Sequence, residues 1–352
     1  MSDATKPDRS PSSLLYSRAT QSLTKFATMT NENSEPLPVI ESWDTYWPGA
    51  QTSAAYSADG TSDPLVLSFW DDYFRDVRDR DGEPKIIDVA SGNGAVVDYA
   101  SAVFGGQLPD FTCLDVSPSA IRMLEKRFPG VHGIVADAAA IPLDSASYDI
   151  ATSQFGIEYA GLEALDEVSR LIVPGGELVL LLHYRDGIIY RQCQASLSAI
   201  NEMQEAKFIP ACRAMFEAGF ALLRGGDRAR YSAAGKQFAP AIRAMEAIMT
   251  RHGRDVAAST ILRVYRDVRT LHAHMRQCEP SAVLGWLEKL QQAIEAYAGR
   301  MASMRDVAIE ATTFEQVCAD LGEKEFEILR AKPLADPDQE LPLAWSLVAR
   351  KR

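Results

Sequence analysis

The residues of this chain that could do chemistry begin in the stretch KIIDVASGNGA, which starts at Lys85. A short apolar run carries the carboxylate of Asp88, then turns through Ser91 and two glycines, and a helical pattern follows. Gly92 and Gly94 lack a Cβ, so a ligand can reach the backbone N–H groups of the turn, and unusual φ angles cost little there. The turn indicates a ligand site, although such strand-to-helix turns also occur for purely structural reasons.

Two further carboxylates narrow the choice of ligand. Asp115 is the next-to-last residue of the run FTCLDV, 23 residues after Gly92, where a carboxylate can accept hydrogen bonds from both hydroxyls of a ribose. Asp137 is the next-to-last residue of the run GIVADA, where an acid can receive the exocyclic amine of adenine. A dinucleotide site prefers a third glycine where this chain has Val97, and no phosphate-loop Lys-Ser/Thr pair follows. The pattern suits an adenosine that carries a zwitterionic tail and no phosphates.

Candidate acid–base residues follow the fourth and fifth predicted strands. They are Glu158, Tyr159 and His183, the last of which closes the apolar run ELVLLLH. Each has a structural alternative, because His183 could only hydrogen-bond to the cap and Glu158 and Tyr159 could cap a helix. No metal site is expected, since His272 and His274 point to different faces of a helix and the five cysteines show no ligand spacing.

The elements that must position these residues alternate between strand and helix patterns. We predict strands over 85–90, 111–116, 133–138, 148–154 and 177–183, with helices over 95–104, 118–128 and 161–172 between them. Ser117 and Pro118 are typical of the N-cap and first position of a helix, and the Pro-Gly-Gly sequence at 174–176 should end the third helix. This order implies a parallel sheet covered by helices, with right-handed connections.

The pattern changes after about residue 185. Apolar stripes at helical spacing run through 238–249 and 283–301, and no clear strand is expected before about 307. Strand patterns return at 326–331 and 345–351, with turn-forming residues between them. The sequence therefore predicts five parallel strands, a helical insertion and a terminal β-hairpin.

Taken together, these motifs resemble class I S-adenosyl-L-methionine (SAM)-dependent methyltransferases of the small-molecule type. The resemblance covers about 85–183 and resumes at about 313–352. IIDVASGNG is similar to the methionine-binding first motif, CLDVSPSAI to the second, with Asp115 as the ribose acid, and VADAAAIPL to the third. YDIATSQFGIEYA, followed by the Pro-Gly-Gly turn, is similar to the fourth strand and the approach to the fifth.

The resemblance implies a Rossmann-like, doubly wound, seven-stranded sheet whose last strand is antiparallel, with a helical insertion between strands 5 and 6. SAM is then the expected cofactor. The expected cofactor-binding residues lie in the loops after the first four strands, and they are Asp88, Ala90, Ser91, Gly92, Asn93, Gly94, Asp115, Val116, Asp137, Ala138, Ser153, Gln154 and Phe155.

The chain departs from the family pattern at two places, and the second of them bears on the substrate. Ala90 stands where the family often has glycine, and the fourth strand ends in SQFG and not in the (D/N)PPY seen in many enzymes that methylate amines of nucleic acids or proteins. We therefore expect methyl transfer to an O, N or C nucleophile of a small molecule. The alternatives are an NAD(P)-dependent reductase on a similar sheet, and a SAM-fold protein with other SAM chemistry or a non-catalytic binding role.

The net charge and the composition limit the classes of partner that this protein can bind. A net charge of −12 argues against general nucleic-acid binding, although residues 185–300 hold 17 basic and 11 acidic residues, which suits solvated helix faces or an anionic substrate or headgroup. No apolar run approaches the roughly 18 residues of a membrane span, so no stable membrane insertion is expected. The scattered cysteines suit a reducing compartment, and we expect a cytoplasmic location. The wide apolar stripes on the predicted helices are also compatible with a homodimer interface.

The expected organisation has five parts. Residues 1–40 form a disordered or flexible tail, and 41–84 a helical and aromatic arm. Residues 85–184 form the SAM-binding core, 185–308 a helical cap insertion, and 309–352 the end of the core with its hairpin. Within the arm, Trp43, Tyr46, Trp47 and Tyr56 could form a lid over the cofactor or simply pack as an aromatic arm.

Overall fold

The computed structural model describes residue 43 and residues 63–352, so the predictions for 1–40 and for Tyr46, Trp47 and Tyr56 lie outside the described residues. The described chain forms two compact units. The sheet unit comprises residues 63–194 and 300–352, and the helical unit comprises residues 195–299. Helices α7 (Ile188–Glu205) and α11 (Pro280–Asp306) each run from one unit into the other.

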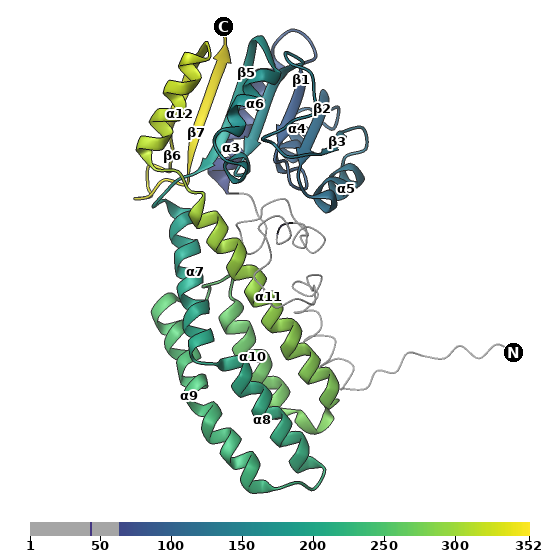
Figure 1. Ribbon diagram of the computed structural model, residues 1–352, viewed down its shortest axis with the longest axis vertical. Coiled ribbons are helices and arrows are strands. Elements are labelled where there is room, and N and C mark those ends of the chain that lie inside the picture. The colour runs from purple at the N-terminus through teal and green to yellow at the C-terminus, as the bar shows by residue number, and fades with distance from the viewer. Residues whose placement is uncertain (1–42, 44–62) are drawn as a thin grey trace, which may run out of the picture. The chain divides into compact units, whose positions relative to one another are not determined.

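The sheet unit is built on one seven-stranded sheet with the order β3-β2-β1-β4-β5-β7-β6 (Figure 1). The strands are β1 (Lys85–Val89), β2 (Asp110–Asp115), β3 (His132–Val135), β4 (Tyr148–Gln154), β5 (Ile172–His183), β6 (Phe326–Leu334) and β7 (Ala344–Lys351). Strands β1 to β5 pair in parallel, and β7 lies antiparallel between β5 and β6. The predicted sheet with its antiparallel last strand is confirmed.

The helices of the sheet unit are α3 (Pro64–Arg78), α4 (Ala95–Val103), α5 (Pro118–Arg127), the 3₁₀ helix η2 (Ile157–Ala160), α6 (Ala164–Leu171) and α12 (Ala311–Glu323). Two of them begin at a side-chain cap, Asp63 for α3 and Ser117 for α5. The Ser117 side chain accepts the Ala120 N–H at 3.1 Å and Pro118 occupies the first helical position, which confirms the predicted start of α5.

The start of the fifth strand was predicted wrongly. Strand β5 begins at Ile172, which the sequence pattern assigned to the preceding helix, and not at Glu177. Tyr148 pairs with Ile172 and Ile150 pairs with Glu177, so the residues between them bulge out of the ladder. Gly175 adopts a φ of 82° within this bulge, which a glycine tolerates. The Pro-Gly-Gly sequence therefore interrupts a strand and does not simply end a helix.

The sheet is held to helix α3 by a buried carboxylate on β5. Glu177 is 2% exposed, and its Oε2 accepts hydrogen bonds from the Tyr73 hydroxyl at 2.8 Å and from Arg80 at 3.0 Å. Its Oε1 accepts one from Arg350 on β7 at 2.7 Å. Burial alone would raise the pKa of Glu177, but these hydrogen bonds hold that pKa below its usual range.

Replacing Glu177 with alanine is expected to lower the free energy of unfolding by about 3 kcal/mol, because the buried Tyr73 hydroxyl and two guanidinium groups lose their acceptor. Urea unfolding at neutral pH measures the change, with the exposed Glu323→Ala on α12 as the control. The Glu177 contribution should disappear as the pH falls through the lowered pKa. Equal stability of Glu177→Ala and Glu323→Ala would show that the network contributes nothing.

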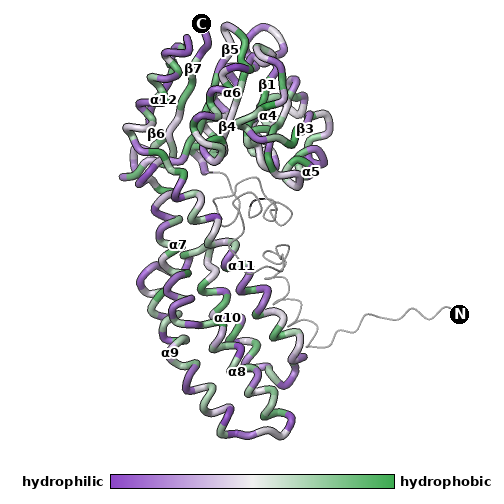
Figure 2. The backbone as a smooth tube through the Cα atoms, viewed as in Figure 1, coloured by the Kyte–Doolittle hydropathy of each residue, from purple (hydrophilic) through white to green (hydrophobic). Residues whose placement is uncertain are grey.

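The helical unit packs α8 (Phe208–Leu223), α9 (Arg228–His252) and α10 (Thr260–Ala273) with parts of α7 and α11. The predicted stripes face its core: Phe238 and Met245 are buried on α9, and Leu287 and Ile294 are buried on α11. Figure 2 shows the helices of this unit alternating between hydrophilic and hydrophobic positions. None of the helices in the described part of the chain is long and apolar enough to span a membrane.

Candidate functional site

The candidate site lies beyond the carboxyl ends of the parallel strands, where the strand order reverses between β1 and β4. Ligands of open α/β sheets bind at this switch point. The loop after β1 is left-handed at Ala90 (φ 55°), Gly92 (φ 53°) and Gly94 (φ 92°). A Cβ on Gly94 would lie only 2.9 Å from the Phe128 ring, so the loop requires glycine there.

A glycine that sequence reasoning missed completes this loop. Gly156 follows β4, and a Cβ on it would lie 2.7 Å from both the side chain and the carbonyl oxygen of Ala90. The signal in the sequence is the glycine of the SQFG stretch, which the sequence pattern marks only as a departure from the (D/N)PPY motif. Arg127 also supports the loop, since its guanidinium donates to the carbonyl oxygen of Asn93 at 2.6 Å.

Asp115 connects the loop to the end of β2. Its Oδ2 accepts the Gly92 N–H at 2.8 Å, and its Oδ1 accepts the Ser117 N–H at 2.8 Å. The Ser91 N–H donates to the carbonyl oxygen of Leu114 at 3.0 Å. The structure thus brings Asp115 and the glycine turn into direct contact, with 8% of Asp115 exposed.

Asp88 is buried between β1 and β4, with 1% of its surface exposed. Its Oδ1 accepts a hydrogen bond from the Thr152 hydroxyl at 2.8 Å, a partner that the sequence did not indicate. Its Oδ2 has no hydrogen-bond partner among the residues that the structure describes. Burial, aided by the nearby charge of Asp115, raises the pKa of Asp88 to about 8. A buried oxygen without a donor fits a ligand that brings an ammonium group.

Asp88→Asn is expected to make the ligand-free protein more stable than wild type by about 3 kcal/mol at about pH 8, and much less so at about pH 5. The raised pKa means that the folded state holds a proton that the unfolded state lacks between about pH 4 and pH 8, so stability falls as the pH rises through this window. Asparagine keeps an acceptor for Thr152 and does not ionise.

Urea unfolding of both proteins at the two pH values measures this difference. Asp110→Asn is the control, because Asp110 is an exposed acid at the first residue of β2. Its stability should depend on pH in the same way as that of wild type. An Asp88→Asn protein with the same pH dependence as wild type would contradict the raised pKa.

The expected adenine-side residues differ in exposure. Val116 is 39% exposed and presents apolar surface, whereas Ala138 is buried. Asp137 lies two residues past the end of β3 and is exposed, and its Oδ1 accepts the Ala139 N–H at 2.9 Å. One oxygen of Asp137 therefore stabilises its own turn.

The residues at the end of β4 hold other segments in place. Ser153 Oγ accepts the Ile157 N–H at 3.1 Å, and Gln154 Oε1 accepts the indole N–H of Trp70 on α3 at 2.5 Å. Phe155 has a φ of 51°, and its ring lies 4.8 Å from that of His183. The side chains of Ser153 and Gln154 thus bond to protein atoms, and the Phe155 ring borders the acid–base residues.

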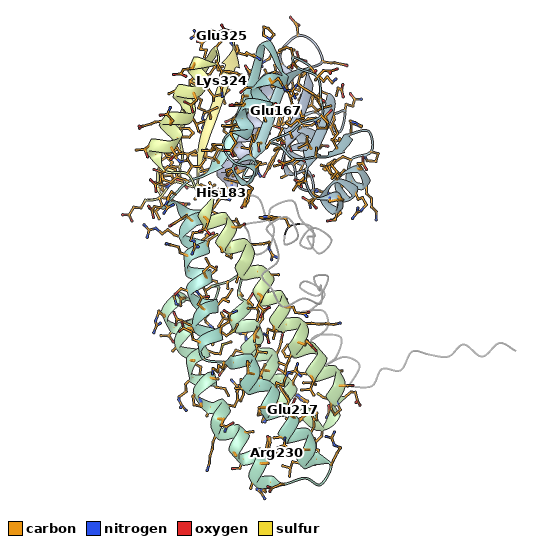
Figure 3. All side chains as sticks on the ribbon, in the orientation of Figure 1. Glu167, His183, Glu217, Arg230, Lys324 and Glu325 are labelled. Carbon is orange, nitrogen blue, oxygen red and sulfur yellow. The ribbon has the colours of Figure 1, made fainter. Side chains whose placement is uncertain are left out.

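Glu158 and His183 form a buried pair at the carboxyl ends of β4 and β5, and Figure 3 shows His183 at the end of its strand. Glu158 Oε1 lies 2.8 Å from His183 Nδ1 and accepts the backbone N–H of His183 at 2.8 Å. The side chains are 1% and 2% exposed. Within residues 63–352, neither Glu158 Oε2 nor His183 Nε2 has a hydrogen-bond partner.

This geometry can move a proton. When Nδ1–H donates to the carboxylate, His183 Nε2 keeps a lone pair and can act as a base. The Tyr159 ring lies 5.9 Å from the His183 ring, edge to face, and 5.6 Å from the Trp43 ring. Burial, followed by the charge of Glu158, raises the pKa of Tyr159 well above its usual value, so this phenol stays protonated and suits a hydrogen-bond donor.

In the described part of the chain, no group of three or more His, Cys, Asp or Glu side chains could hold a metal ion. His272, in the helical unit, instead pairs with the Tyr231 hydroxyl through its Nε2 at 2.8 Å.

Comparisons with known proteins point to one family. Residues 87–180 match the family model described as a methyltransferase domain. An uncharacterized methyltransferase of Schizosaccharomyces pombe is 30% identical over 105 residues, which are 30% of this chain and 41% of that protein. A demethylmenaquinone methyltransferase of Renibacterium salmoninarum is 33% identical over 99 residues, 27% of this chain and 40% of that protein. This chain thus spans about two fifths of the length of these relatives.

One solved structure matches over most of the chain. The plantazolicin methyltransferase BpumL, in complex with a triazolic desmethylPZN analog and SAH (S-adenosylhomocysteine), is 12% identical. The match covers 95% of this chain and 98% of that chain, with a TM-score of 0.48.

Proposed function

This chain contains a class I SAM-dependent methyltransferase domain, and we propose that it transfers the methyl group of SAM to a nucleophile of a small molecule, with His183 as the general base. The observation that carries the proposal is the buried Glu158–His183 pair, which lies at the same edge of the sheet as the glycine turn and Asp115.

The residues present fit SAM. Asp88 has a buried oxygen without a donor for the ammonium of the methionine part, and the turn beside it has no Cβ at Gly92 and Gly94, so a ligand can approach the backbone closely. Asp115 would accept from the ribose hydroxyls while it holds Gly92, and the exposed apolar surface of Val116 would contact adenine. When bound, SAM supplies a methyl group made electrophilic by its sulfonium.

Side chains of the protein would then orient the methyl acceptor and remove its proton. Glu158 holds the His183 ring so that Nε2 takes a proton from an acceptor hydroxyl or ammonium, and its carboxylate stabilises the imidazolium that forms. Tyr159, which stays protonated, would donate a hydrogen bond to the acceptor. A general base of this kind typically increases the reaction rate by a hundredfold to ten-thousandfold, and alignment of the acceptor increases it further.

The acceptor class follows from three observations. The chain has SQFG where amine-methylating enzymes of nucleic acids and proteins often have (D/N)PPY, and its net charge is −12. One similar protein is named for demethylmenaquinone, a small molecule. We therefore propose a small-molecule methyl acceptor and no nucleic acid. The homodimer and the cytoplasmic location stay predictions.

Thermal unfolding with added ligands tests the cofactor, and a turnover screen tests the reaction. SAH should raise the melting temperature in a concentration-dependent way, whereas NADH should not. SAH release from SAM should then depend on a member of a panel of small phenols, amines and carbon acids. Stabilisation by NADH alone would reject the methyltransferase proposal in favour of a reductase.

A further inference from the structure

The helical unit contains a cavity of about 530 Å³ between α8, α9 and α10. Every residue that lines this cavity lies within the helical unit, so it shares none with the candidate methyltransferase site. Its volume falls within the range of small-molecule binding sites, about 300 to 1,000 Å³. The methyl transfer proposed above gives this cavity no role.

The walls of the cavity are largely aromatic and aliphatic. Rings come from Phe208, Tyr231, Phe238, Tyr265 and His272, which are five of the twelve lining residues. The rings of Phe208 and Phe238 lie 5.5 Å apart, and those of Tyr231 and His272 lie 6.4 Å apart and nearly parallel. Aromatic walls favour a flat apolar body that can stack on them or meet them edge to face.

Among the described residues that line the cavity, Arg269 carries the one permanent charge. Arg269 on α10 lies with its guanidinium 5.6 Å from the centre of the Tyr265 ring, and no carboxylate of the described residues forms an ion pair with it. No acidic residue lines the cavity in the described part of the chain. Glu246 accepts the Tyr265 hydroxyl at 2.6 Å but is not on the cavity wall. A guanidinium on an otherwise uncharged wall favours an anionic group on the ligand.

We propose that this cavity is a second small-molecule site, which binds a flat aromatic organic acid. The aromatic body lies among the rings of α8, α9 and α10, and the acid group lies against Arg269. The proposal does not depend on methyl transfer, because it uses no residue of the sheet unit.

Two glycines allow a matched test. Gly235 lines the cavity, and a Cβ added there meets no atom within 4 Å, so Gly235→Leu adds bulk at the cavity wall from a position with room for its first side-chain atom. A Cβ added to Gly285 on α11 also meets no atom within 4 Å, and Gly285 does not line the cavity. Both changes replace a helical glycine and should therefore raise the helix propensity of their segments by a similar amount.

The probe pair is anilinonaphthalene sulfonate and phenylnaphthylamine, which share one aromatic body and differ in the anionic group. Titrations follow probe fluorescence in the full-length protein with saturating SAH, which removes binding at the SAM site. We expect wild type and Gly285→Leu to bind the sulfonate alike, and Gly235→Leu to lose this binding. Arg269→Gln should weaken the binding of anilinonaphthalene sulfonate about tenfold, because one charge-assisted hydrogen bond is lost, and the affinity for phenylnaphthylamine should not change. Naphthoic acid should displace the sulfonate, and naphthamide should not.

Two results would overturn the proposal. Equal sulfonate binding by Gly235→Leu and Gly285→Leu would place the probe elsewhere. An Arg269→Gln protein that binds both probes as wild type does would show that the cavity does not recognise an acid.

Discussion

Asp115→Ala is expected to weaken SAH binding by at least about a hundredfold, the loss of two hydrogen bonds to a charged acceptor. The proposed ribose bonds disappear, and the Gly92 and Ser117 N–H groups that Asp115 accepts lose their partner, so the glycine turn is no longer held against β2. The ligand-free protein should also lose about 2 kcal/mol of stability, because those two N–H groups lie in a buried region.

Isothermal titration calorimetry measures the dissociation constant. Asp110→Ala is the matched control, since Asp110 is an exposed acid that begins the same strand that Asp115 ends. Its SAH affinity should equal that of wild type. An unchanged dissociation constant in Asp115→Ala would remove Asp115 from the ribose site.

His183→Asn is expected to lower kcat by about a hundredfold to ten-thousandfold once an acceptor is identified, while SAH affinity stays within about twofold. Asparagine keeps a donor toward Glu158 but has no basic nitrogen, so the buried carboxylate keeps a partner. The rate of SAH formation and calorimetry measure the two quantities. His132→Asn, an exposed histidine at the start of β3, should leave both unchanged.

Two companion variants separate catalysis from positioning. Glu158→Gln keeps the oxygen that accepts both His183 bonds but removes the charge that would stabilise the imidazolium, so kcat should fall and KM should stay. In His183→Ala, added imidazole should restore part of the rate by occupying the space left by the ring. A His183→Asn enzyme with the wild-type rate would assign the pair a structural role only.

Much of the fold follows from patterns that are local in the sequence. The start of α5 depends on Ser117 and Pro118, which act on their own helix, and the glycine turn depends on φ angles that Gly92 and Gly94 adopt at little cost. The strand and helix order predicts a parallel sheet, because such strands must be joined by crossovers. The placement of Asp115 and His183 at one edge of the sheet follows from the same rule.

The pairing of side chains was decided by the tertiary structure. Asp88 meets Thr152, Glu158 meets His183 and Glu177 meets Tyr73 and Arg350, and every pair joins segments at least 25 residues apart. Strand register sets the Asp88–Thr152 and Glu177–Arg350 contacts, and one residue of slip would turn these side chains to the other face. The packing of η2 and α3 against the sheet sets the other two. The bulge that starts β5 at Ile172 likewise arises from pairing with β4.

The sequence by itself determined which elements form, their order and the sheet edge that carries the candidate site, since these depend on periodicity and capping within short windows. Only the tertiary structure decided which buried oxygens lack a donor, as at Asp88, and where helices leave space, as beside Gly235. The reason is physical: burial and cavities arise from the packing of distant segments, and no single segment contains that information.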